Sequence, residues 1–205
     1  SLLILLASAL LSSCGVAQDE TLSEEVATQV MEAYQNEKYD AAIALTEGIP
    51  DDSSWVRVRA ASLHRRGEAR FFEFEIAGSI EDFDAYLRYF PEQDPHHWQR
   101  GLSYYYAEAY EEGKAQFERH QTVNTQDVEN AVWHFLCAVR APGGSVEKAR
   151  ESFIPIQRDP RVPMKEVHAL FAGTGSVEEV LAAAAPNEDN VLSDEERDHL
   201  CCAHL

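Results

Sequence analysis

Apolar and small residues recur along this chain with a helical period, and a longer repeat lies on top of it. The step from Gly67 to Gly101 equals the step from Phe83 to Phe117. Apolar positions return every three to four residues, and no sustained apolar–polar alternation is bounded by turns. A fixed period in the low thirties is typical of stacked helical hairpins. The pattern therefore predicts an all-α fold.

The repeated glycine predicts how the two helices of one hairpin pack. When the units are numbered as 60–93 and 94–127, the glycines share position 8, and position 20 is small in both, Ser79 and Gly113. Glycine within a helix costs about 1 kcal/mol relative to alanine, which suggests a packing reason. We expect these small residues to leave room for the aromatic side chains of the partner helix.

The stretch from Gly101 to Phe117 resembles the core of the tetratricopeptide repeat, G-x-x-Y-x-x-x-G-x-Y-x-x-A-x-x-x-F. Two departures are visible: Glu108 stands where the turn glycine usually is, and Gly113 replaces alanine. In the preceding unit, Pro91 occupies the place of the closing proline. The resemblance implies antiparallel helical hairpins stacked in a right-handed solenoid.

A third unit begins at Asn130 after a two-residue slip. Phe153 then falls on the position of Phe117, and Cys137 takes the place of the small glycine. Pro142–Gly144 supplies the turn between the helices, and Ser145 is suited to cap the second one. The expected array covers 20–205, with units near 23–56, 60–93, 94–127, 130–163 and 164–186.

Capping signals predict the outer helices of this array. Thr21 and Glu24 have the spacing of a capping box for a helix over 22–36, and Tyr39 opens its partner. Further helices are expected over 164–172, from Ser176 to 184, and from 193 to 205. The last one has no stop signal, so we interpret the chain as truncated inside a further repeat.

The N-terminal residues 1–17 read as an export signal. An apolar stretch of about ten residues, too short to span a bilayer, resembles the core of a signal peptide. The Leu11–Cys14 segment resembles a bacterial lipobox with Cys14 as the acylated residue, whereas small residues up to Ala17 would suit ordinary signal peptidase. Both cleavages predict an exported protein of the cell envelope or periplasm, and the first predicts a lipid anchor to the membrane.

Acidic residues outnumber basic ones by 36 to 17, which gives a net charge of −19. Such a surface repels phosphate backbones, so nucleic acid is excluded as an expected partner. The charge has two interpretations, solubility or a basic partner, and its spread over many helices favours solubility.

The sequence contains no recognisable catalytic or cofactor motif. His96 and His97 are adjacent and diverge on a helix, so they cannot chelate as an i, i+4 pair. Cys137 is expected to be a buried thiol, with a disulfide to Cys201 or Cys202 as the minor alternative. We therefore expect no metal, no cofactor and no enzymatic activity.

The resemblance to tetratricopeptide repeats also implies a concave groove that binds a peptide or a partner protein. The alternative is that its aromatic residues only pack against neighbouring helices. Residues 96–141 look like those of bacterial cell-envelope lipoproteins with such repeats, which implies an exported scaffold or adaptor. A structural or self-associating envelope component is the alternative, followed by an enzyme with an unrecognised site. The implied groove residues are His64, Glu68, Phe71, Phe72, Trp98, Leu102, Tyr105, Tyr106 and His134.

Overall fold

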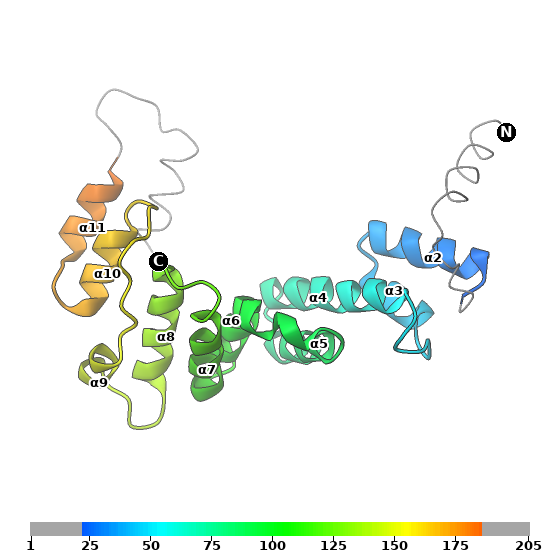
Figure 1. The fold of residues 1–205 in the computed structure, drawn as a ribbon, viewed down its shortest axis with the longest axis horizontal. Coiled ribbons are helices and arrows are strands. Elements are labelled where there is room, and N and C mark those ends of the chain that lie inside the picture. The colour runs from blue at the N-terminus through cyan, green and yellow to red at the C-terminus, as the bar shows by residue number, and fades with distance from the viewer. Residues whose placement is uncertain (1–21, 186–205) are drawn as a thin grey trace. The chain divides into compact units, whose positions relative to one another are not determined.

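The computed structural model describes residues 22–185, in which every regular element is a helix (Figure 1). The all-α prediction is confirmed. Two compact units divide between Leu63 and His64, within one continuous helix, and each is described by itself. The first unit holds α2 (Glu24–Gln35), α3 (Tyr39–Leu45) and the start of α4 (Val56–Phe72). The second holds the rest of α4, α5 (Ile76–Tyr89), the 3₁₀ helix η1 (Pro91–His96), α6 (Trp98–Tyr106), α7 (Tyr110–His120), α8 (Val128–Arg140), α9 (Val146–Glu151), α10 (Met164–Ala172) and α11 (Val177–Ala184).

The first unit is a small hairpin of α2 and α3. Val30 and Ala42 are fully buried. Its N-terminal cap differs from the predicted one: Ser23 is the N-cap, and its hydroxyl accepts a hydrogen bond from Val26 N at 3.3 Å. Glu24 is then the first residue of the helix rather than the third. The prediction chose the wrong one of two hydroxyl residues that can cap the same turn.

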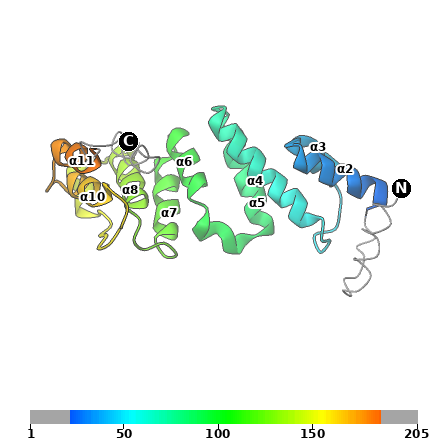
Figure 2. The same cartoon turned by 90° about the horizontal axis from the view of Figure 1, so that it is seen from above.

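In the second unit, the repeated glycines pack as predicted. A Cβ added to Gly67 would lie 2.7 Å from the Phe83 ring, and one added to Gly101 would lie 2.7 Å from the Phe117 ring. Because both phenylalanines are almost completely buried, each hairpin closes around an aromatic ring that only glycine admits. Consecutive helices α6, α7 and α8 lie side by side in both views (Figures 1 and 2).

The turns inside three hairpins share one backbone conformation that the sequence only partly revealed. Glu37, Phe74 and Glu108 all have φ near +60°, at 58°, 62° and 61°. In each turn the next residue donates its N–H five positions back, as Ala109 does to Tyr104 O at 2.9 Å. This is the helix ending that glycine usually provides. The departure noted at Glu108 is therefore a regular feature of these hairpins.

The third hairpin departs from the repeat pattern. Ser145 caps α9 as predicted, but α9 ends at Glu151. Phe153 therefore lies beyond the helix, where its ring contacts Phe135 and His168 at centroid distances of 5.6 and 4.7 Å. Helix α10 packs on α8. The repeat pattern predicted Phe153 on the second helix of the third hairpin, whereas the structure places it after that helix.

The last described hairpin, α10 and α11, has the predicted boundaries. Gly173 ends α10 in the left-handed conformation, with φ of 81°. Ser176 and Glu179 form a complete capping box at the start of α11. The expected helix over 193–205 lies outside the described residues.

Candidate functional site

Large aromatic side chains are exposed on the second unit to a degree that folding does not explain. Phe72 and Phe74 are 80% and 81% exposed, and Tyr106 and Trp98 are 51% and 45% exposed. Isolated exposed apolar residues are ordinary, but a connected group marks an interaction site. We call the connected group the aromatic surface; its members are Phe71, Phe72, Phe74, Trp98, Tyr105, Tyr106 and Trp133.

Ring contacts join most of this surface into one chain. The ring of Phe71 lies 5.7 Å from that of Phe72 and 5.6 Å from that of Tyr106, centroid to centroid. Tyr105 contacts Tyr106 at 5.5 Å and Trp133 at 5.2 Å. All four contacts are edge-to-face, a geometry that the ring quadrupoles favour. Each of these five rings is thus held in place by a neighbour, whereas Phe74 and Trp98 join the surface through the pockets that they line.

One end of the aromatic surface forms an apolar pocket of about 210 Å³, lined by Phe71, Phe72, Phe74, Ile76 and Tyr106. Phe74 contributes to it from the αL turn between α4 and α5. A non-glycine residue in that conformation carries strain of about 1–2 kcal/mol. A large, exposed aromatic residue at a strained position is a cost to folding, which points to a role in binding.

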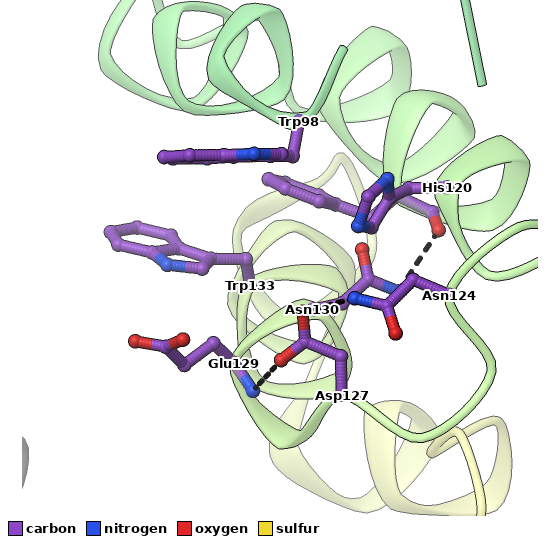
Figure 3. Close-up of a pocket in the computed structure, with 8 residues that line it drawn as sticks. Trp98, His120, Asn124, Asp127, Glu129, Asn130 and Trp133 are labelled. Atoms are coloured by element: carbon purple, nitrogen blue, oxygen red, sulfur yellow. Dashed lines mark hydrogen bonds between the residues drawn. The ribbon is translucent and has the colours of Figure 1, made fainter. Parts of the chain in front are cut away.

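The other end holds a second pocket, of about 290 Å³, between α6 and α8 (Figure 3). We call it the indole pocket, because Trp98 and Trp133 form its two flat walls. The opposite side is polar. Its lining residues are Trp98, Phe117, His120, Asn124, Asp127, Glu129, Asn130 and Trp133.

Carboxylates define the polar side of the indole pocket. Asp127 caps α8, accepting from Glu129 N at 3.0 Å. Arg161 forms ion pairs with Asp127, Glu129 and Asp159, at 2.7, 2.5 and 2.6 Å. The Asp159 side chain is buried, which opposes ionisation, yet its hydrogen bonds to Arg161 and Val128 N lower its pKa. Three carboxylates thus share one guanidinium, which leaves two negative charges beside the pocket.

A neutral histidine fixes the start of α6 and with it Trp98. His97 is the N-cap, and its Nδ1 accepts a hydrogen bond from Arg100 N at 3.3 Å. The ring is buried among His64, Phe83 and Tyr86. This burial lowers the pKa of His97 to about 3. The ring therefore stays uncharged, and its Nδ1 remains able to accept the hydrogen bond from Arg100 N.

A buried arginine also secures α6. Arg100 is 8% exposed. Its guanidinium donates to Asp84 at 2.8 Å, to Gln116 at 2.7 Å, and to Asp94. A buried charge needs such complete pairing to be tolerated. The cluster joins α5, η1, α6 and α7, so it sets the position of Trp98 relative to the rest of the unit.

Five of the nine predicted groove residues lie on the aromatic surface: Phe71, Phe72, Trp98, Tyr105 and Tyr106. The other four are not among the rings of that surface. His64 packs against Phe83 and Tyr86, at centroid distances of 5.7 and 4.9 Å. Glu68 is partly buried and accepts a hydrogen bond from Gln99 at 3.3 Å. Leu102 is half-buried on α6.

His134, the fourth of these residues, is buried in the structure. It is 3% exposed, and its Nε2 lies 3.2 Å from a carboxylate oxygen of Glu118 on α7. Burial lowers its pKa, against the opposing effect of Glu118. The side chain is therefore part of the α7–α8 packing.

Phe74 and Trp133 were missing from the predicted groove. The step from Phe74 to Glu108 equals that from Gly67 to Gly101, so the repeat already placed Phe74 in a turn. What the sequence did not show is that the turn projects its ring beside Phe71 and Tyr106. Trp133 contacts Tyr105 and also forms a wall of the indole pocket.

Within the described residues 22–185, no group of three or more His, Cys, Asp or Glu residues could hold a metal ion. No helix in that range is long and apolar enough to cross a membrane. Cys137 has no disulfide partner within that range, and burial raises the pKa of its thiol to about 12. Cys14, Cys201 and Cys202 lie outside the described residues.

Comparisons with protein-family models, with curated proteins and with solved structures found no match for this chain. The aromatic surface is therefore the feature of the molecule that bears most directly on its function.

Proposed function

We propose that this chain is an interaction scaffold of the tetratricopeptide-repeat type, which binds a peptide segment of a partner protein on the aromatic surface. The observation that carries the proposal is the connected group of rings, four of which are between 45% and 81% exposed. Aromatic residues in preorganised surfaces are the usual hot spots of binding. Their fixed positions lower the entropy cost of association.

The stacked arrangement is supported by features that recur in consecutive hairpins. Gly67 with Phe83 and Gly101 with Phe117 make the same close contact. The αL turns at Phe74 and Glu108 are separated by the same step as the two glycines. Repeating hairpins build extended surfaces by stacking. The aromatic surface draws on α4, the α4–α5 turn, α6 and α8, which suits a partner segment in extended or helical form.

A selection of displayed peptides tests this function. Peptides recovered on the purified protein should bind Phe72→Ala at least ten times more weakly than the wild type. Val177→Ala is the matched control, because Val177 is also exposed, at 53%, but lies on α11. Equal affinity of both variants for every recovered peptide would refute the proposal. Light scattering on the same samples identifies self-association, and a dimer lost in Phe72→Ala would assign the surface to a second copy.

We also propose that the protein is exported, with Cys14 as a lipid attachment site. This rests on the apolar stretch before Cys14 alone. Mass spectrometry of the mature N-terminus tests it: an acylated N-terminal Cys14 is expected, and an unmodified N-terminus at Gln18 would overturn the lipid anchor while supporting export.

A further inference from the structure

We propose that the indole pocket binds a lysine or arginine side chain of the partner segment. This inference rests on the proposed function and specifies the partner segment: apolar residues contact the aromatic surface, and one basic residue enters the indole pocket. Three independent features of the pocket support a cation over a neutral or acidic side chain.

The first feature is the pair of indole walls. Trp98 and Trp133 flank the opening (Figure 3). Tryptophan has the strongest attraction for a cation placed over its ring face. This unit already uses such contacts internally, because Arg100 lies 5.7 Å from the Tyr104 ring centroid and Arg140 lies 5.1 Å from that of Tyr110. Trp133 is braced by Tyr105, so this wall does not need to be ordered on binding.

The second feature is charge. Among the described residues, no lysine or arginine lines the indole pocket, whereas Asp127 and Glu129 do. Arg161 neutralises only one of the three carboxylates that it pairs with. The Glu129 side chain remains 43% exposed, so its carboxylate is accessible to a ligand. The net charge of −19 on the whole chain acts in the same direction and speeds the approach of a basic segment.

The third feature is an unsatisfied acceptor in the pocket wall. Asn130 is 3% exposed, and its Nδ2 donates to Phe117 O and Gln121 Oε1, both at 3.1 Å. These two acceptors fix the orientation of the amide. The buried Oδ1 is left with no donor among the described residues. A buried acceptor without a partner is costly, and an N–H group entering the pocket would supply one after a small adjustment of the wall.

The size of the pocket suits one side chain. Sites for drug-sized molecules begin at about 300 Å³, and this pocket measures about 290 Å³. An extended aliphatic stem can lie along the indoles while its charged end reaches the carboxylates, as lysine and arginine stems commonly do on apolar surfaces.

The test uses small probes, so that it does not depend on finding the partner. Acetyl-arginine amide and acetyl-lysine amide are titrated against the full chain, with the neutral acetyl-citrulline amide as the matched control. The indole N–H signals of Trp98 and Trp133 are followed by NMR, and Trp55, which lies in the other unit, is the internal reference. Both basic probes should shift the two pocket signals saturably in the millimolar range, with the citrulline probe at least five times weaker.

Variants complete the test. Trp98→Leu should weaken the basic probes at least tenfold and Glu129→Gln about threefold, while Glu112→Gln on α7 should change nothing. Equal affinity for arginine and citrulline probes, or equal shifts at Trp55, would overturn the inference. Binding of tetramethylammonium alone would also overturn it and would assign a quaternary ammonium ligand to the pocket. Shifts that follow protein concentration without a probe would overturn it as well and would assign a second copy of the chain. Because Phe72 lies in the other pocket, Phe72→Ala should leave probe binding intact, so the failure of this inference is distinct from that of the proposed function.

Discussion

Replacing Glu108 with glycine is expected to stabilise the second unit. Glu108 has φ of +61° in the turn between α6 and α7. An L-residue there costs about 1–2 kcal/mol, because its Cβ crowds the following carbonyl group. Glycine removes that strain but gains freedom in the unfolded chain, which returns about 0.4–1 kcal/mol. The expected net gain is therefore about 0.5–1 kcal/mol in the free energy of unfolding.

Urea denaturation followed by circular dichroism measures this gain, and two controls isolate its cause. Glu108→Ala keeps the Cβ and should leave the midpoint nearly unchanged. Glu81→Gly, at an exposed position inside α5, should lower stability by about 1 kcal/mol, as glycine does in an ordinary helix. If Glu108→Gly destabilises the protein as Glu81→Gly does, the αL turn is not present in solution.

The same substitution at Phe74 separates folding from binding. Phe74 has φ of +62° and is 81% exposed, so glycine relieves the strain with little loss of packing. Phe74→Gly should be at least as stable as the wild type. A stable variant that lacks one wall of the apolar pocket is the cleanest tool for testing the aromatic surface.

Three further substitutions probe the packing that positions this surface. Gly101→Ala places a Cβ 2.7 Å from the Phe117 ring and should cost about 1–3 kcal/mol in urea denaturation by overpacking; a neutral result would contradict the close contact. Arg100→Met leaves the buried partners of the guanidinium unpaired and should lower the free energy of unfolding by about 3–5 kcal/mol. Amide hydrogen exchange throughout α6 should then be faster, and unchanged exchange would show that the Arg100 cluster does not hold the helix. The pKa of His97 falls from its ordinary 6.5 to about 3 on folding, so the unfolded chain binds the proton first as the pH is lowered. The free energy of unfolding should therefore decrease by up to about 1.4 kcal/mol for each pH unit on going from pH 6.5 down to pH 3. His97→Asn keeps a capping acceptor and should reduce that slope, and equal slopes would refute the assignment.

Local rules predicted much of the fold. The glycine–phenylalanine contacts could be predicted from the sequence because a fixed repeat period aligned them. The caps at Ser145 and Ser176 could be predicted because a hydroxyl cap acts over a single turn. Thr21 was assigned in place of Ser23 because two hydroxyl residues compete for the same turn. The repeat pattern did not show that α9 ends before Phe153, nor that α10 packs against α8, a contact that no short stretch of sequence encodes.

The candidate site was only partly predictable for a related reason. The repeat register placed Phe71, Tyr105 and Tyr106 on one face, and the structure joins their rings. The indole pocket, in contrast, is formed by residues from α6, α7, α8 and the α7–α8 loop. Its charge depends on Arg161, which lies beyond both α8 and α9 in the chain and returns to pair with Asp127. Such convergence is a property of the tertiary structure.

Binding of a partner segment to the aromatic surface is tested most directly by the calorimetric affinity of one selected peptide for the wild type and for Phe74→Gly. We predict an affinity at least ten times weaker for Phe74→Gly, with a urea midpoint equal to or above that of the wild type. An unchanged affinity in that stable variant would contradict the claim.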